Sequence, residues 1–257
     1  MWKIVRASVR GTAHEKDGTP CQDFQDVRVI ERDSDEILLI AISDGAGSAK
    51  HSHVGSKAAV DALLNRAAAL IKSVQDVSES DVREWFRETI SHLDQTARCH
   101  DSDLREFDCT LLFAAVSKGG GAFAQIGDGA WVFERDGTIE TATWPTSGEF
   151  VNQTIFVTGG DAFDAFQFRK VNSEIHRFAG FTDGIQPIAL LLSTKTVHQP
   201  FFAPMFEDLD STDDIEMLNS CLANFLNSRK VNDRTSDDKT LVLARHIKTP
   251  DTNGADK

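Results

Sequence analysis

The sequence of 257 residues contains no tyrosine and no closely spaced pair of cysteines. Its four cysteines, Cys21, Cys99, Cys109 and Cys221, lack the C-x-x-C spacing of zinc ribbons and dithiol oxidoreductases. The longest fully apolar runs, such as 38–42, are far shorter than the roughly 20 residues that span a bilayer. The N-terminus also lacks the apolar stretch of a signal peptide. We therefore predict a cytoplasmic protein that does not bind to membranes.

Positive charge is scarce as well. The chain has 27 Lys and Arg against 40 Asp and Glu, a formal net charge of −13. No cluster of basic side chains is present that would displace counterions from nucleic acid, so nucleic acid is excluded as a partner. The glycine-rich phosphate-binding loops of nucleotide-binding proteins are missing too. The acidic excess suits solubility or a group of carboxylates around cations.

Hydrophobic periodicity predicts one layered α+β domain over residues 1–247, followed by a polar tail, 248–257, that we expect to be disordered. Helices are predicted at about 54–71, which Ser52 would cap, and at about 80–98, 185–192 and 213–226. Strands are predicted at 3–10, 26–31, 37–43, 109–116, 123–126, 131–135, 139–143, 176–182 and 240–246.

Aspartates beside glycines recur at the ends of predicted strands. They occur in Asp44-Gly45, Gly127-Asp128-Gly129 and Asp183-Gly184, and Asp237-Asp238 precedes the last strand. Carboxylates that converge from several strands repel one another unless a cation lies among them, and oxygen ligands suit Mg²⁺ or Mn²⁺ better than zinc. A single Asp-Gly pair is more often a hairpin turn than a metal ligand. The pattern alone leaves turns and a metal site about equally favoured.

Six motifs resemble, in order, those of the metal-dependent type 2C protein phosphatases, and most closely a compact bacterial branch of that family. The motifs are Pro20-Cys-Gln-Asp23, Ser43-Asp-Gly-Ala-Gly47, Asp108-Cys-Thr110, Ile126-Gly-Asp128, Phe181-Thr-Asp-Gly-Ile185 and Asp237-Asp-Lys-Thr-Leu241. The resemblance covers about residues 5–246. It implies an α-β-β-α sandwich, in which two antiparallel sheets pack face to face and helices cover both outer sides.

The resemblance also implies hydrolysis of phosphoserine and phosphothreonine in a phosphoprotein, the target of a serine/threonine kinase. By motif position, Asp44 bridges two Mn²⁺ or Mg²⁺ ions and the carbonyl of Gly45 joins it. Asp183 and Asp237 hold one ion, and Asp23 orients metal-bound water. Two cations lower the pKa of a bridging water, so that hydroxide attacks phosphorus in line without a covalent intermediate.

Several residues depart from the family pattern. Asp128 matches an aspartate used at a third ion, but Pro187 replaces a further aspartate of that site. Gln22, in the second shell of the metals, stands where the family usually has Glu. The usual phosphate-binding arginine is absent, and Arg10 or His14 is a candidate replacement, although Arg10 also fits a solvated strand residue.

Two alternative functions follow from these departures and from the metal chemistry. A catalytically weak or inactive relative that binds phosphoproteins is suggested by Gln22 and Pro187. A phosphohydrolase of small phosphate esters would use the same metals. Retention of the four aspartates at positions 23, 44, 183 and 237 favours an active protein phosphatase.

Overall fold

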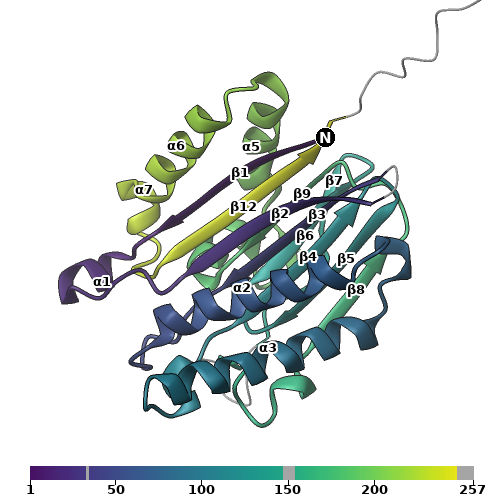
Figure 1. The fold of residues 1–257 in the computed structure, drawn as a ribbon. Helices are drawn as coiled ribbons and strands as arrows, with labels where there is room; N and C mark the ends of the chain where they lie inside the picture. Colours follow the sequence, from purple (N-terminus) through teal and green to yellow (C-terminus); the bar gives the residue numbers. More distant parts are fainter. Residues whose placement is uncertain (33–34, 147–153, 248–257) are drawn as a thin grey trace, which may run out of the picture.

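The computed structural model describes residues 1–32, 35–146 and 154–247, and its architecture is a sandwich of two antiparallel five-stranded sheets. Sheet I has the strand order β2-β3-β4-β5-β8, and sheet II has the order β1-β12-β9-β6-β7 (Figure 1). The strands of sheet I are β2 (Phe24–Arg32), β3 (Asp35–Ser43), β4 (Leu111–Ser117), β5 (Gly120–Ile126) and β8 (Gln167–Val171). Those of sheet II are β1 (Trp2–Val9), β12 (Lys239–His246), β9 (Arg177–Phe181), β6 (Ala130–Arg135) and β7 (Thr138–Thr141).

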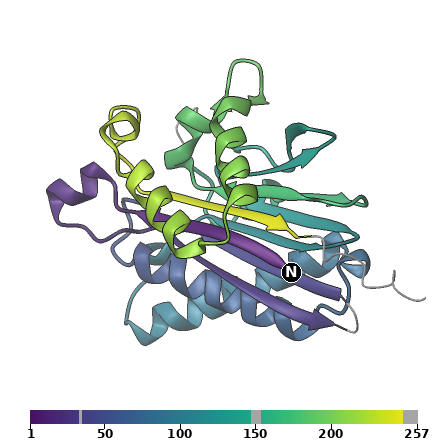
Figure 2. The same cartoon turned by 90° about the horizontal axis from the view of Figure 1, so that it is seen from above.

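Helices cover the outer face of each sheet. The helices are α1 (Thr12–Asp17), α2 (Ser52–Leu70), α3 (Glu79–Cys99), α4 (Gln186–Ala189), α5 (Gln199–Ser211), α6 (Ile215–Leu226) and α7 (Arg229–Asn232). The pair α2 and α3 packs on sheet I, and α5 and α6 lie on the opposite side of the molecule over sheet II (Figure 2). A small ribbon of β10 (Leu190–Leu191) and β11 (Thr196–Val197) precedes α5.

The unbroken apolar run of β3 reflects burial on both of its faces. Leu39 packs toward α2 and α3, whereas its neighbour Ile40 packs between the two sheets. On β12, Leu243 faces the helices over sheet II and Val242 faces sheet I. Three apolar layers thus separate four layers of secondary structure, which confirms the predicted α-β-β-α sandwich.

Two local predictions were wrong. Ser52 does not cap α2, because it is the first helical residue and His51 precedes the helix without a capping side-chain bond. The helix predicted at 185–192 is broken: a 3₁₀ turn at Asp183–Ile185 leads into the short α4, and the chain is extended again at Leu190. The apolar residues there pair as a strand with β11 instead of continuing the helix.

Several elements carry too weak a sequence signal and were missed, namely α1, β8, β10, β11, α5 and α7. The hairpin turn at Asp136-Gly137 was predicted correctly, and both residues have positive φ, 52° and 75°. No helix in the described part of the chain is long and apolar enough to cross a membrane. The tail at 248–257 lies outside the described residues, so its predicted disorder stays a prediction.

Candidate metal centre

Three aspartates that follow strand ends converge at one end of the sandwich. Asp44 follows β3, Asp128 lies two residues after β5, and Asp183 lies two residues after β9. One carboxylate oxygen of each can be chosen so that the three oxygens lie within 4.8 Å of one another. We call these three residues the acidic cluster. Since they come from both sheets, the cluster forms where the two sheets meet.

Glycines allow the backbone to present these carboxylates. Gly127 has φ of 121°, and a Cβ there would lie 2.6 Å from the side chain of Thr110. A Cβ on Gly45 would lie 2.8 Å from the carbonyl oxygen of Ser52. Thr110 also fixes Asp44 from both sides, because its hydroxyl accepts the Asp44 N–H at 3.0 Å and its own N–H donates to the Asp44 carbonyl at 2.8 Å. The Asp-Gly pairs at 44 and 128 are therefore parts of a site and not only turns.

Asp23 lies beside the cluster and is almost fully buried. The hydroxyl of Thr182 donates to its Oδ2 at 2.8 Å, and Thr240 also hydrogen-bonds to its side chain. Burial nevertheless raises the pKa of Asp23 to about 7, and the negative charge of Asp238 adds to the rise. Its other oxygen, Oδ1, is buried without a hydrogen-bond partner.

The pKa values of the cluster rise for the same reasons. Burial is the largest cause at each position, followed at Asp44 and Asp183 by repulsion from neighbouring carboxylates. The pKa of Asp44 is raised well above its usual value, that of Asp183 is raised to about 8, and that of Asp128 is raised as well. Asp237 is among the charges that raise all three pKa values, so it lies close to the cluster.

Oxygens without hydrogen-bond partners indicate whether a cation fits at the acidic cluster. Buried oxygens of Asp23, Asp128, Asp183 and Gln22 have no hydrogen-bond partner. Within the described residues, no Lys or Arg forms an ion pair with the acidic cluster. Buried carboxylate oxygens that lack both donors and counter-charges are costly. An all-oxygen ligand set compensated by a hard divalent cation resolves that cost, so the residues fit a cation of that kind.

Asp237 and Asp238 face different surroundings. Asp237 is exposed and contributes to the electrostatics of the cluster. Asp238 is buried, and its two oxygens accept the backbone N–H groups of Gly11 and Gln22, each at 2.6 Å. The neighbouring side chains therefore diverge, as expected for residues that enter a strand.

Within the described residues, neither candidate for the phosphate-binding cation pairs with the acidic cluster. Arg10 is exposed, and its Nη1 lies 3.5 Å from the carbonyl oxygen of Thr19. His14, on α1, places Nδ1 3.0 Å from Oδ1 of Asp238. These contacts lend no support to phosphate binding by Arg10 or His14, and both roles stay predictions.

Sequence reasoning missed the polar residues that support the cluster. Thr154 donates to Oδ2 of Asp128 at 2.6 Å, and the Gln186 side-chain amide donates to the Asp128 carbonyl. Thr182 and Thr240 lie within the motifs that contain Asp183 and Asp237. Their place in those motifs is a sequence signal that could have identified them as residues that hold the carboxylates. No comparable signal marks Thr154, which lies 26 residues from its partner.

Solved structures confirm the fold. The catalytic domain of the serine/threonine protein phosphatase PstP, in complex with two manganese ions, has a TM-score of 0.67 at 16% identity, with 96% of this chain and 99% of that chain covered. PppA, described as a regulatory component of the type VI secretion system in Pseudomonas aeruginosa, has a TM-score of 0.65 at 15% identity and covers 96% and 98% of the two chains.

Sequence comparison gives information on the family as well as on the fold. The chain is 32% identical over 250 residues to serine/threonine-protein phosphatase 3 of Escherichia coli strain K12, which covers 95% of this chain and 98% of that protein. The sequence profile described as protein phosphatase 2C matches residues 10–227. With most of the chain inside that match and the acidic cluster assembled at the expected motifs, the chain belongs to the protein phosphatase 2C family.

Proposed function

We propose that this protein, a metal-dependent phosphatase of serine and threonine residues in proteins, holds two Mn²⁺ or Mg²⁺ ions in its acidic cluster. Asp44 would bridge the ions together with the carbonyl of Gly45, and Asp183 and Asp237 would hold one of them. The observation that carries this proposal is the convergence of three partly buried carboxylates, of which Asp128 and Asp183 each keep a buried oxygen without a hydrogen-bond partner in the described structure.

The residues around the ions have distinct tasks. Bound there, the ions would lower the pKa of a water nucleophile and offset the charge of the phosphoryl oxygens. Asp23 is held by the Thr182 hydroxyl through Oδ2, which leaves Oδ1 to accept a hydrogen bond from the attacking water and so orient it. Gln22 carries a buried side-chain oxygen that can accept a similar bond without adding negative charge.

The proposed centre has two ions and no third ion. Asp128 keeps one oxygen, Oδ1, without a hydrogen-bond partner, which is compatible with its assignment to a third ion. Pro187, which replaces a further aspartate of that site, has no side-chain oxygen to complete it. We therefore treat Asp128 as a member of the cluster and assign no third ion.

The substrate is a phosphoprotein, and we infer that a serine/threonine kinase produces it. An inactive binding relative is disfavoured by the assembled cluster, and a small-ester hydrolase is disfavoured by similarity to protein phosphatases over nearly the whole chain. The cytoplasmic location stays a prediction.

A peptide assay tests this function. Phosphoserine, phosphothreonine and phosphotyrosine peptides and an aryl phosphate are incubated with the protein and Mn²⁺, Mg²⁺, Zn²⁺ or a chelator. We expect hydrolysis of the phosphoserine and phosphothreonine peptides with Mn²⁺ or Mg²⁺, loss of activity with the chelator, and poor support by Zn²⁺. Full activity in chelator contradicts the metal assignment, and turnover of the aryl phosphate alone favours the small-ester alternative.

A further inference from the structure

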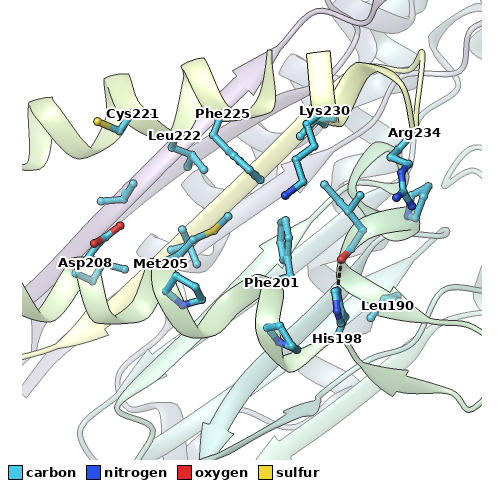
Figure 3. Close-up of a pocket in the computed structure, with 18 of the residues that line it drawn as sticks. Leu190, His198, Phe201, Met205, Asp208, Cys221, Leu222, Phe225, Lys230 and Arg234 are labelled. Atoms are coloured by element: carbon cyan, nitrogen blue, oxygen red, sulfur yellow. Dashed lines mark hydrogen bonds between the residues drawn. The ribbon is translucent and has the colours of Figure 1, made fainter. Parts of the chain in front are cut away.

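An apolar cavity of about 650 Å³ lies on the outer face of sheet II, away from the inter-sheet core. Its floor includes Val5 of β1 and Leu243 of β12, and its walls come from α5 and α6. Figure 3 shows Phe201 and Met205 of α5 facing residues of α6 across the cavity. Such a volume, lined mainly by aliphatic and aromatic side chains, matches small-molecule sites better than an extended groove for a peptide.

Charged residues lie at the two ends of this cavity. Lys230 and Arg234 lie at one end, and Asp208 lies at the other (Figure 3). Within the described residues, the side chains of Lys230 and Arg234 have no ion-pair or hydrogen-bond partner, although the chain carries a net charge of −13. Their neighbour Arg229, which does not line the cavity, has Nε 3.7 Å from Asp233 Oδ2. Two cations without partners at the mouth of an apolar cavity favour an anionic group there.

We propose that the cavity binds a small amphiphilic monocarboxylic acid and that its binding is coupled to metal binding. The carboxylate would lie at Lys230 and Arg234, and the hydrocarbon part would pack along Phe201 and Phe225. Asp208 at the far end disfavours a second carboxylate, so the site selects one anionic head and an uncharged tail.

The coupling follows from the segments that form the cavity walls. Pro187 and Ile188 line it from α4, which begins three residues after Asp183. The next residue back, Gln186, hydrogen-bonds to the Asp128 carbonyl. One wall of the cavity is thus tied to two members of the acidic cluster.

The opposite wall of the cavity is formed in part by residues that lie shortly before Asp237 in the chain. Val231 of α7 and Arg234 line the cavity just before that residue. The buried ammonium of Lys239 donates to Asn232 Oδ1 at 2.9 Å and to the Asp237 carbonyl at 3.3 Å, which ties α7 to the loop that carries Asp237. A ligand that packs against α4 and α7 restrains both segments, so the ions bind with less further ordering. The coupling, though not the binding of the acid, rests on the proposed metal site.

Binding is tested first without metal. Octanoate, octanol and octanedioate are titrated, below any aggregation, into the metal-free protein by calorimetry and by NMR of cavity methyl groups. We expect octanoate to bind about tenfold more tightly than octanol or octanedioate. The double variant Lys230→Ala/Arg234→Ala should reduce octanoate binding to the level of octanol, while Arg229→Ala should leave it unchanged.

Three results would overturn the proposed site. They are no octanoate binding, equal binding of octanol, or equal loss in Arg229→Ala. A dimer in sedimentation velocity that Lys230→Ala/Arg234→Ala dissolves would assign the cavity to a second copy instead. All of these substitutions are at exposed positions, so a folded variant is expected.

Coupling is tested by repeating Mn²⁺ titrations at saturating octanoate. We expect the Mn²⁺ dissociation constant to fall by about fivefold or more, and octanoate affinity to rise by the same factor with Mn²⁺ bound. Binding of octanoate without a change in Mn²⁺ affinity would refute the coupling but not the proposed acid-binding site. Failure of Mn²⁺ to bind at all refutes the proposed metal centre, while the binding result stands on its own.

Discussion

Two carboxylate regions lie near each other in this protein, and their oxygens are satisfied in opposite ways. Asp238 is saturated by the protein itself, because two backbone N–H groups donate to it and His14 lies 3.0 Å away. The acidic cluster keeps oxygens that have no donor, and its members raise one another's pKa values. Asp238 is the more deeply buried, since the residues of the acidic cluster are only partly buried, so burial alone does not identify a metal site.

The two regions differ in whether their carboxylate oxygens have hydrogen-bond partners. A carboxylate with both oxygens hydrogen-bonded holds the chain together, as Asp238 holds the loop before β2 against the start of β12. A carboxylate with a buried, unpartnered oxygen needs something from outside the chain. The predictions below test whether that distinction separates metal ligands from structural residues.

Neutralising the cluster should have the largest effect. We expect Asp44→Asn and Asp183→Asn each to lower turnover of a phosphothreonine peptide on the order of a thousandfold, since each removes a proposed ligand. Neither variant should melt earlier than the parent in chelator, because loss of one charge relieves repulsion. Asp94→Asn on the surface of α3 is the matched control. A near-normal rate in either cluster variant would remove that residue from the site.

Substitution of Asp237 should mainly affect activity, whereas substitution of the adjacent Asp238 should mainly affect stability. Asp237→Asn should lower activity at limiting Mn²⁺ by about a hundredfold and leave the melting temperature nearly unchanged. Asp238→Asn should cost about 1–3 kcal/mol of unfolding free energy, because a buried N–H loses its acceptor, and reduce activity less. Parallel melting curves and kinetics check this. The reverse order would show that the ligand is Asp238.

The metal-free protein should lose stability as pH rises. Folding raises the pKa of Asp23 to about 7 and that of Asp183 to about 8, well above the value near 3.9 of an unfolded chain. The folded state therefore holds protons that the unfolded state has released, and this contribution is full below about pH 4 and lost as pH rises through 7 to 8.

Melting temperatures in chelator should then fall by on the order of several degrees between pH 5.5 and 8.5. Added Mn²⁺ should remove or invert this slope, because the ions then compensate the ionised carboxylates. Asp183→Asn should show a shallower slope than the parent. A melting temperature that rises with pH in chelator would contradict the account of the cluster.

Gln22→Glu should have the smallest effect. The added charge would lie at a buried oxygen that now has no partner, beside the proposed ions. We expect the Mn²⁺ concentration for half-maximal activity to fall severalfold and the rising limb of the pH–rate profile to move to higher pH. Overlapping Mn²⁺ titrations of variant and parent would place Gln22 outside the metal site.

The sequence predicted the parts of this protein that depend on strong local patterns. The apolar run of β3 and the stripe of α3 are long and regular. The motifs around Asp44 and Asp183 were found at strand ends, and the resemblance to the family supplied their expected roles. The broken helix at α4 was missed because its apolar residues fit a helix or a strand equally well until β11 pairs with it. The saturation of Asp238 and the support of Asp128 by Thr154 depend on contacts between distant segments, which no spacing in the sequence reveals.

The central claim is that the partnerless oxygens of the acidic cluster bind two divalent ions. Anomalous diffraction from crystals grown with Mn²⁺ tests it most directly. We predict two manganese peaks, both within coordination distance of Asp44, with one of them also at Asp183 and Asp237 and none at Asp238. Absence of manganese from the cluster, or a peak at Asp238 in its place, would contradict the account.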